Sequence, residues 1–322
     1  MSDKGGSRLE TARMEFDWSP LSHERWRALL REAPRANLLQ SWPFAVAARL
    51  HDQMMSRRGL IMEGGRMIGF MQIQEIRLGP IHVVKLYRGP LWLDPDPPEA
   101  RWQAFLGAFN RAFPPRLGRW RRVLLELDEG EASRAMLRAA RFVPKGAEPY
   151  RTTILRLEPD LAKIRSGLKR NWRNHLVQAE RHAFEIVYDR DGLDAAEFLA
   201  GYGADKARRG YPGPEPARLR TMITAGRGDM MILSARLDGR MAAGVLIFRH
   251  GSGATYQAGW TSGEGRAVNA HHRLLWHAVA TLKEDGALNF DLGGVNAGRA
   301  EGVTTFKAGL GARPLVLTGL FG

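Results

Sequence analysis

The 322-residue sequence contains no cysteine, and this absence removes several classes of chemistry. Disulfides, thiolate nucleophiles and cysteine-ligated zinc are excluded, whereas the redox compartment stays undetermined. No apolar run approaches the roughly 20 residues that a membrane-spanning helix needs. The N-terminal residues 1–13 are polar and charged and lack the apolar core of a secretory signal. We therefore expect a chain without an integral membrane segment that works in the cytoplasm.

Acidic residues are scarce relative to basic ones. The chain has 48 lysines and arginines against 34 aspartates and glutamates, which gives a formal net charge of +14. A field of this sign attracts polyanions, either nucleic acid or an anionic membrane surface. Arginine supplies most of the basic charge, and GC-rich genomes also yield arginine-rich chains that have no polyanion partner. Both interpretations of the charge stay open.

One structural pattern occurs twice along the chain. Two apolar runs flank Gly64-Gly65, and two more flank Asp238-Gly239, which predicts a β-hairpin at each place. Each hairpin is followed by a third strand, an amphipathic helix and a further strand, and the last strands carry Glu126 and Asp291 at corresponding positions. A repeat this long indicates a duplicated domain. Strands that alternate with helices predict an α/β protein with two mixed sheets.

Further helices are expected outside the repeat. Residues 20–33 and 42–51 have helical patterns, with Ser41 as the N-cap of the second. A single helix is expected over residues 160–182, with apolar residues along one stripe. Its other side carries a group of basic residues, namely Lys163, Arg170, Arg173 and Arg181. This side is either a solvated helix face or an anion-binding surface.

The C-terminal part contains the most suggestive chemistry. A buried strand from Phe290 stops at Gly293-Gly294, and after a loop over residues 297–305 comes Lys307, between Phe306 and small residues. Glycines at a strand end let a ligand approach the backbone. We expect Asp291 and Lys307 to meet beside these glycines and form a site. The alternative is an ordinary turn followed by a surface lysine.

In their order along the chain, several segments resemble the Fem family of aminoacyl-tRNA-dependent aminoacyltransferases, which are built from two tandem GNAT (Gcn5-related acetyltransferase) domains. The matching segments are Gln40-Ser41-Trp42, Tyr87-Arg88-Gly89-Pro90, the helical Arg173-Asn174-His175-Leu176-Val177-Gln178-Ala179, and Asp291-Leu292-Gly293-Gly294 with Phe306-Lys307. The resemblance covers nearly the whole chain. It implies two GNAT-like α/β domains, at 1–148 and 149–322, with the last strand, about 314–322, returning to the first domain.

The resemblance also implies a reaction and its partners. An aminoacyl group would move from aminoacyl-tRNA to an amine of a peptidoglycan precursor or of another small or peptide acceptor. Aminoacyl-tRNA would be the co-substrate, with no further cofactor and no metal. The expected partners are tRNA and an anionic acceptor, with a possible association with the membrane surface. Arg173 and Lys307 would bind the anionic acceptor or stabilise the transferring group. Arg170, on the basic helix side described above, is a further candidate for substrate binding.

The transfer chemistry suggests roles for individual residues. The amine must attack an ester carbonyl, an oxyanion must be stabilised, and a proton must be removed. Lys307 can supply the positive charge, and Asp291 can accept the proton or orient the amine, or else simply cap the following loop. Tyr211 and Tyr256 can donate hydrogen bonds, although a core position is an alternative for Tyr256.

Two other readings of the function remain. The segment Ser262–Ala267 resembles the loop on which acetyl-CoA-binding GNAT enzymes hold pyrophosphate at a helix N-terminus. Those enzymes usually have Gln or Arg where this chain has Trp260, so transfer from acyl-CoA or an acyl carrier protein is the alternative. A non-catalytic polyanion-binding module is the third reading. The spacing of His271, His272 and His277 does not favour a metal site.

Overall fold

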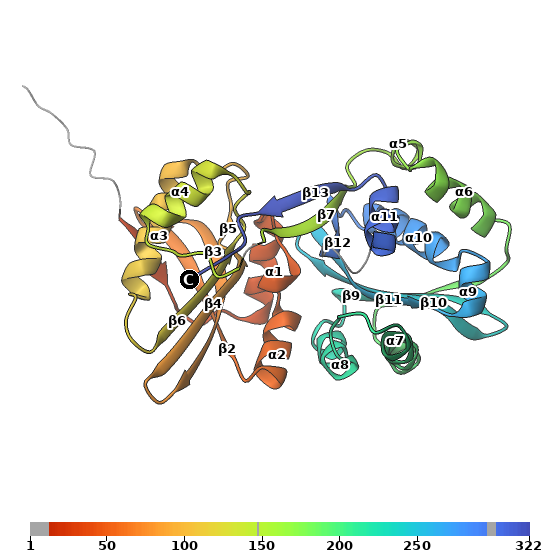
Figure 1. The fold of residues 1–322 in the computed structure, drawn as a ribbon, viewed down its shortest axis with the longest axis horizontal. Helices are drawn as coiled ribbons and strands as arrows, with labels where there is room; N and C mark the ends of the chain where they lie inside the picture. Colours follow the sequence, from red (N-terminus) through yellow and green to blue (C-terminus); the bar gives the residue numbers. More distant parts are fainter. Residues whose placement is uncertain (1–12, 147, 295–300) are drawn as a thin grey trace, which may run out of the picture.

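The computed structural model describes residues 13–146, 148–294 and 301–322, with the side chains of 301–304 left aside. The chain folds into two mixed β-sheets that lie next to each other, each with helices packed on its faces (Figure 1). The predicted α/β class with two mixed sheets is confirmed. We place the domain boundary at 148/149, between the last helix on the first sheet and the first strand of the second.

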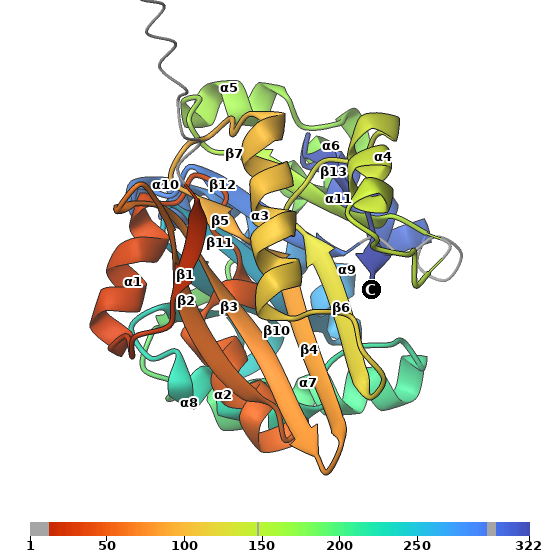
Figure 2. The ribbon, with the colours of Figure 1, turned by 90° about the vertical axis from the view of Figure 1, so that its left-hand side faces the viewer.

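The first sheet has the strand order β1-β2-β3-β4-β6-β14, and β5 pairs with β3. Neighbouring strands are antiparallel except for the parallel pair of β4 and β6. Helix α3 (Glu99–Ala112) connects these two strands and lies across the sheet, with its apolar side buried (Figure 2). The strands are β1 Met14–Asp17, β2 Met55–Glu63, β3 Arg66–Leu78, β4 Ile81–Gly89, β5 Leu91–Trp92, β6 Arg119–Leu125 and β14 Leu320–Phe321.

The second sheet has the order β13-β7-β12-β11-β10-β9-β8. Its parallel pair, β11 and β12, is connected by α9 (Gly263–Ala267) and α10 (Ala270–Glu284), as β4 and β6 are by α3. The repeated order of elements therefore reflects two copies of one topology. The strands are β7 Tyr150–Arg156, β8 Glu185–Asp189, β9 Met230–Leu237, β10 Arg240–His250, β11 Gly253–Thr261, β12 Asn289–Gly294 and β13 Arg313–Leu317.

Both predicted hairpins are present, and their turns explain the residues found there. Gly64 and Gly65 have φ values of 56° and 78°, and Asp238 and Gly239 have 47° and 76°. Two successive residues with positive φ characterise the type I′ turn, whose twist suits a two-residue hairpin. Glycine and aspartate tolerate this conformation better than most residues, so both turns are encoded locally.

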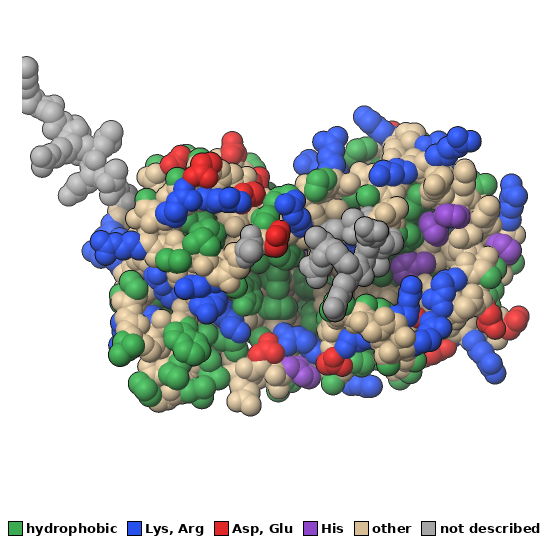
Figure 3. All heavy atoms as spheres, viewed as in Figure 1, with side chains coloured by type: hydrophobic (Ala, Val, Ile, Leu, Met, Phe, Trp, Pro, Cys, Tyr) green, Lys and Arg blue, Asp and Glu red, His purple; other side chains and the backbone are tan. Residues whose placement is uncertain are grey.

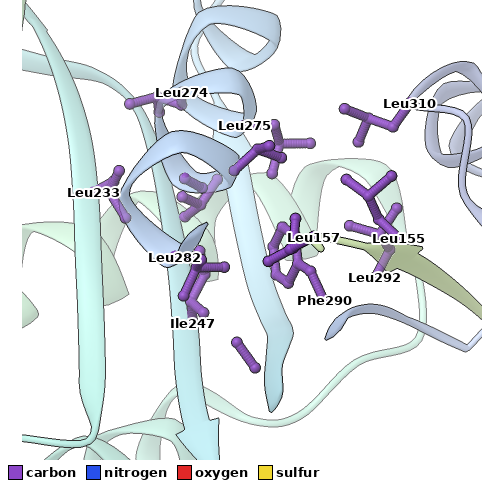
Figure 4. Packing of buried hydrophobic residues seen from close by; sticks show 14 of the residues in the cluster. Leu155, Leu157, Leu233, Ile247, Leu274, Leu275, Leu282, Phe290, Leu292 and Leu310 are labelled. Atoms are coloured by element: carbon purple, nitrogen blue, oxygen red, sulfur yellow. The ribbon is translucent and has the colours of Figure 1, made fainter. Parts of the chain in front are cut away.

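The core of the second domain forms between α10 and the sheet. Leu274, Leu275 and Leu282 of α10 are fully buried or nearly so, and they face strand residues that include Ile247 and Phe290 (Figure 4). At roughly 1.5–3 kcal/mol for each fully buried large apolar side chain, this face is a main source of stability for the second domain. It fixes the position of β12, which carries Asp291.

Four helices fill the space between the two sheets: α1 (His23–Glu32), α2 (Trp42–His51), α7 (Ala195–Arg209) and α8 (Pro216–Ala225) (Figure 1). Helix α2 packs against α8, and Leu38 and Ala47 belong to the same buried cluster as residues of α7 and α8. The two domains also come very close at Gly251, between β10 and β11. An added Cβ there would lie 1.8 Å from the backbone oxygen of Leu30 on α1. The two domains therefore share part of one core.

The C-terminus crosses between the domains. Strand β13 pairs with β7 in the second sheet, and β14 then pairs with β6 in the first, with Leu320 opposite Leu124. The single final strand expected over about 314–322 is thus divided between the two sheets. Residues 316–318 already contact the first domain, because Glu129 N donates to the Val316 oxygen at 2.9 Å and Thr318 N donates to the Leu127 oxygen at 3.1 Å.

Several local predictions need correction. The helix expected over 160–182 is two helices, α5 (Leu161–Ser166) and α6 (Arg170–Ala179), because the helix ends at Gly167. The first helix begins at His23, where Ser22 caps it, and not at Pro20. Lys307 lies on a helix, α11 (Glu301–Gly309), and the part of the expected loop at 297–300 lies outside the described residues. Elements that were not predicted include β1, β5, β8, α4 (Glu131–Ala139) and α8.

Candidate active site

The candidate site lies where β11 and β12 stop pairing. Their parallel ladder comprises only three residue pairs, ending with Thr255 opposite Asp291. Beyond it, β11 continues along β10, where its register shifts near Tyr256. Strand β12, which pairs with β7 from Asn289 onward, stays with β7 as far as Gly294. In the first domain the equivalent ladder runs on from His82 to Gly89. The second domain alone therefore has a parallel pair that opens into two diverging strand ends.

Lys307 reaches this opening from α11. Its Nζ donates hydrogen bonds to the carbonyl oxygens of Gly293 and Gly294, at 3.2 and 3.1 Å. The residue is only 9% exposed. Burial lowers the pKa of Lys307 to about 8, while the nearby Asp291 carboxylate opposes the shift. The prediction that Lys307 meets the end of the Asp291 strand is confirmed by these contacts, although its catalytic role stays a prediction.

Asp291 belongs to a buried ion-pair chain that joins the two domains. Arg88 donates through Nη1 to Asp291 Oδ2 at 2.7 Å, and through Nε and Nη2 to both carboxylate oxygens of Glu126, at 2.7 and 3.2 Å. All three residues are at most 5% exposed. The second oxygen of Asp291 accepts from the Thr152 hydroxyl and from the amide of Gly293, at 2.8 Å in the latter case.

These contacts change the expected role of Asp291. Burial raises its pKa, but the Arg88 charge and the donated hydrogen bonds outweigh burial and hold the pKa below its usual value. A carboxylate with a lowered pKa and both oxygens occupied is a poor acceptor for an ammonium proton. The contacts therefore favour a role for Asp291 in positioning Gly293 and the domain junction, and its proton-accepting role stays a prediction.

The Gln40-Ser41-Trp42 segment holds the strand end that carries Arg88. The Gln40 side chain is fully buried and donates to the backbone oxygen of Tyr87 at 2.7 Å, while Gln72 N donates to Gln40 Oε1 at 2.6 Å. Asn37 Nδ2 donates to the Arg88 oxygen at 2.7 Å. Arg88 itself has a φ of 51°, which few arginines adopt. The side-chain amides therefore replace the β-ladder where this strand departs from regular geometry.

Tyr256 and His271 lie behind the opening. The Tyr256 hydroxyl and His271 Nε2 are 3.3 Å apart, and His271 Nδ1 is 3.1 Å from the Thr261 hydroxyl. Burial lowers the pKa of His271 to about 4, so its imidazole is neutral at pH 7. Burial also raises the pKa of Tyr256, which stays protonated and able to donate. Phe306, next to Lys307, packs on the His271 ring at 5.4 Å between centroids.

Tyr211 lies near Tyr256 but is held by different neighbours. Its ring meets Tyr202 edge-on at 6.2 Å, and both pack with α7 and α8. Burial is the main cause of its raised pKa. A donor role toward a substrate stays a prediction for both Tyr211 and Tyr256.

Arg170 and Arg173 lie on α6 and do not join the Lys307 site. Both are exposed. Arg173 Nη2 donates to the backbone oxygens of Ser166 and Leu168, both at 2.9 Å, and so caps the end of α5. Their substrate-binding roles stay predictions. Lys307 is instead linked to α6 through Trp172, whose ring lies 6.0 Å from that of Phe306.

In the loop that would hold the pyrophosphate of CoA, a backbone amide is already bound by a side chain of the same loop. Ser262 Oγ accepts from the amide of Gly265 at 3.0 Å and serves as the N-cap of the short helix α9. The indole of Trp260 packs so closely on α7 that a Cβ on Gly201 would lie 2.2 Å from it. The Gly265 amide is therefore already used within the protein and is not free to bind a phosphate in this arrangement.

Sequence reasoning missed how Arg88, Glu126 and Gln40 work together. Arg88 was noticed only as part of a resemblance, and Glu126 only as the counterpart of Asp291 in the repeat. The sequence does contain one signal for this contact. The duplicated fold places an acid at the end of an equivalent strand in each domain, and one cation can bridge the two acids. Within the described parts of the chain, no group of three or more His, Asp or Glu side chains could hold a metal, and no helix is long and apolar enough to cross a membrane.

Comparisons with known proteins agree with this architecture. Residues 162–308 match the family described as Acetyltransferase (GNAT) domain. The structure is similar to that of FemX, with a TM-score of 0.80 at 16% identity, covering 95% of this chain and 96% of that one. A conserved protein of unknown function from Bacteroides thetaiotaomicron gives 0.61 at 12% identity, with 95% and 97% covered.

A tandem GNAT protein from the clavulanic acid biosynthesis pathway gives a TM-score of 0.52 at 14% identity, covering 96% of this chain and 97% of that one. A sequence search of curated proteins found no significant match. The structural likenesses establish the arrangement of two GNAT folds, and the family match identifies the second of them in sequence. The chain therefore has the fold of two tandem GNAT domains, arranged as in FemX, and residues 162–308 of the second match the GNAT acetyltransferase domain in sequence.

Proposed function

We propose that this protein is an aminoacyltransferase that moves an aminoacyl group from aminoacyl-tRNA to an amine of a peptidoglycan precursor or of another small or peptide acceptor. The observation that carries the proposal is Lys307, a buried ammonium fixed by two carbonyl oxygens where β11 and β12 diverge. It occupies the Phe-Lys segment through which the chain resembles the Fem family.

Lys307 suits a reaction that develops negative charge. The acceptor nitrogen attacks the ester carbonyl carbon, the carbonyl oxygen becomes an oxyanion, and the bond to the ribose oxygen then breaks. Two N–H groups of Lys307 are used by Gly293 and Gly294, so the third can donate to the oxyanion or to the leaving oxygen. The amine loses one proton and the leaving oxygen gains one. A lysine with a pKa of about 8 can serve this exchange near neutral pH.

Two features favour tRNA over acyl-CoA as the donor. The first is the loop after β11, where Ser262 Oγ already accepts the hydrogen bond of the Gly265 amide and Trp260 stands where CoA-dependent relatives have Gln or Arg. The second is the surface charge, because Lys and Arg side chains gather over α5 and α6 of the second domain (Figure 3). A basic surface of this kind suits a long polyanion, whose many phosphates each contribute to binding.

The test is a donor competition. The purified protein is incubated with an amine acceptor mixture and either tRNA charged with labelled amino acids or labelled acetyl-CoA, and label on the acceptor is counted. We expect transfer from charged tRNA that uncharged tRNA inhibits. Transfer from acetyl-CoA alone would support the CoA-dependent alternative, and tight tRNA binding without any transfer would support a polyanion-binding module. Lys307→Met is the matched catalytic control.

A further inference from the structure

The two faces of the first sheet are covered to different extents. Val84 and Leu86 of β4 belong to the core that the sheet forms with α3. Because alternate residues of a strand point to opposite faces, Ile81, Val83 and Lys85 lie on the other side of the sheet. These three residues are only half-buried, whereas Val84 and Leu86 are fully buried.

The helices that pack on this second face contact it near the domain junction. The Arg58 guanidinium of β2 lies 3.9 Å from the centre of the Trp42 ring of α2, and Gln72 Nε2 of β3 donates to the Ser41 oxygen at 3.1 Å. Toward the turn between β3 and β4, apolar residues of the same face are half-buried or exposed: Ile76, Leu78, Ile81, Val83 and Trp120.

These five apolar side chains are neighbours across three strands. Ile76 of β3 pairs with Val83 of β4, and Val83 pairs in turn with Trp120 of β6. Leu78 pairs with Ile81 next to them. Leu78 and Trp120 are the most exposed of the five, at 59% and 56%. A contiguous apolar surface of this kind marks a contact with another molecule or with a membrane.

The loop before β6 adds a projecting residue, Leu117, which is fully exposed. The adjacent Gly118 lies against the β3–β4 turn, since its oxygen accepts from His82 N at 2.7 Å and an added Cβ would lie 2.6 Å from the Pro80 oxygen. The turn and the start of β6 lie at the same end of the molecule (Figure 2). We call the six apolar side chains the sheet-end patch: Ile76, Leu78, Ile81, Val83, Leu117 and Trp120.

Positive charge accompanies the sheet-end patch. Hydrophobic side chains gather at the lower left of Figure 3, over the end of the first sheet, with Lys and Arg side chains beside them. Glu75, the nearest acid along β3, is already paired with Arg57 at 3.4 Å. Burial and the nearby charges of Arg116 and Arg77 lower the pKa of Arg119, so these cations are not neutralised locally. Residues 76–87 and 114–122 contain no Asp or Glu, and their basic residues are Arg77, Lys85, Arg116, Arg119, Arg121 and Arg122.

We propose that the sheet-end patch attaches the protein to an anionic phospholipid surface. Leu78, Leu117 and Trp120 enter the boundary between headgroups and acyl chains, a position that indole rings favour. The surrounding basic side chains contact lipid phosphates, and the two contributions add. The inference goes beyond the proposed function, because attachment does not depend on which group the protein transfers. It gives a defined location to the membrane association that the sequence suggested.

Two other occupants fit this surface less well. A twofold dimer through the patch would bring the same arginines of both copies together, and their repulsion would oppose the contact. The phosphates of RNA would suit the arginines, but they would leave the aliphatic side chains of Leu78 and Leu117 without an apolar partner. An anionic membrane is complementary to both the charge and the apolar surface.

The test is flotation of the full chain with vesicles of phosphatidylcholine alone or of phosphatidylcholine and phosphatidylglycerol in equal amounts. We expect binding to the mixed vesicles only, and weaker binding at high salt because salt screens surface charge. Arg77→Glu with Arg116→Glu should weaken it by about twentyfold or more, since each basic residue near an anionic surface contributes about fivefold. Arg134→Glu with Arg138→Glu on α4 is the matched charge control and should have a much smaller effect.

A second pair of variants tests the apolar contact. Leu117→Ser with Trp120→Ala keeps the charge and should weaken vesicle binding by about tenfold or more. Leu193→Ser, at a position of the second domain that is 85% exposed, is the control and should bind as the wild type does. All substituted side chains are exposed, so thermal unfolding should be nearly unchanged in every variant.

Insertion can be measured directly, because the chain contains no cysteine to compete for a label. An environment-sensitive fluorophore on Leu117→Cys should shift its emission to shorter wavelength with mixed vesicles, and the same label on Leu193→Cys should not. No binding to mixed vesicles, equal losses in patch and control variants, or no shift at residue 117 would overturn the attachment.

Two further results would assign the sheet-end patch to another occupant and overturn the attachment as well. One is weaker tRNA binding by the Leu117→Ser, Trp120→Ala variant without any vesicle binding by the wild type. The other is a wild-type dimer that this variant loses, again without vesicle binding. None of these measurements uses a transfer reaction, so failure of tRNA-dependent transfer would contradict only the proposed function.

Discussion

Lys307 is a buried cation in a protein that already carries excess positive charge, and its environment defines how it should behave. Two backbone carbonyls and the charge of Asp291 stabilise its ammonium form, while burial disfavours it. A lysine with a pKa of about 8 is charged in a large fraction of molecules at pH 7 and neutral in most at pH 9. The stability of the folded protein and the reactivity of Lys307 should therefore both depend on pH between 7 and 9.

The first prediction concerns stability and needs no substrate. Between pH 8 and about 10.5 the unfolded chain keeps a proton on this lysine that the folded protein has lost, so unfolding becomes harder as pH rises. The slope is at most about 1.4 kcal/mol per pH unit. From pH 7 to pH 9, the wild type should therefore gain on the order of 1 kcal/mol relative to Lys307→Met.

Urea denaturation of both proteins at several pH values measures this difference. Lys145→Met, which removes an exposed lysine, is the control and should track the wild type at every pH. A stability difference between wild type and Lys307→Met that stays constant from pH 7 to 9 would show that the ammonium is not destabilised by burial.

The second prediction separates a positioning role of Asp291 from a proton-accepting one. Asp291→Asn removes one of the two carboxylate partners of Arg88 and leaves the pair with Glu126, so the free energy of unfolding should fall by about 1–3 kcal/mol. Asp128→Asn, which breaks an exposed ion pair with Arg35, should cost at most about 1 kcal/mol. Chemical denaturation gives both values. A stable Asp291→Asn protein with a shifted pH–rate profile would restore the general-base role.

At the scale of elements, the opening between β11 and β12 depends on glycine. Gly293 has a φ of 81°. An added Cβ would lie 3.2 Å from the backbone oxygen of Tyr256 and 3.6 Å from Lys307 Nζ. Gly65 has a similar φ of 78°, but nothing lies within 4 Å of its Cβ position. Both positions disfavour alanine by about 1 kcal/mol or more through backbone strain.

The third prediction follows from this matched pair. Gly293→Ala and Gly65→Ala should lower stability by similar amounts. Only Gly293→Ala should lower the transfer rate, by about tenfold or more, because strain at this strand end shifts the carbonyls that hold Lys307. Turnover and thermal unfolding are measured for both variants. Equal activities would mean that the β12 end takes no part in the reaction.

Elements encoded by local patterns could be predicted from the sequence, and long-range contacts could not. The two type I′ hairpins and the amphipathic α10 follow from residues adjacent to one another. The break between α5 and α6 was missed because a continuous apolar stripe spans Gly167, and β8 was missed because it is short. The meeting of Asp291 and Lys307 was foreseen, but Arg88 lies 203 residues from Asp291, and nothing local signals that pair.

On the scale of the whole molecule, charge is distributed unevenly between the domains. Basic side chains gather over α5 and α6 of the second domain, and acidic ones gather over α4 of the first (Figure 3). The two domains also share apolar packing around Leu38, and buried ions join them at Arg88. The Lys307 site therefore lies beside a junction that apolar packing and buried charges both hold together.

The fourth prediction tests the basic surface. Binding of tRNA should weaken steeply as salt rises, and the double reversal Arg170→Glu with Arg181→Glu should weaken it further and reduce the salt slope by about one to two. Arg134→Glu with Arg138→Glu on α4 changes the net charge equally and should have a much smaller effect. Fluorescence anisotropy with labelled tRNA across a salt series gives both slopes. Equal losses for the two double variants would indicate non-specific attraction by net charge alone.

The most direct test is single-turnover transfer of a labelled aminoacyl group from saturating charged tRNA to an amine acceptor, with wild type, Lys307→Met and Lys307→Arg compared from pH 6.5 to 9.5. If the Lys307 ammonium stabilises the transition state, Lys307→Met should be slower by about 10²–10³-fold, with tRNA affinity little changed. The wild-type rate should carry a falling component near pH 8 that Lys307→Arg lacks, because arginine stays charged. A Lys307→Met protein that transfers at the wild-type rate would contradict the assignment of this lysine to the reaction.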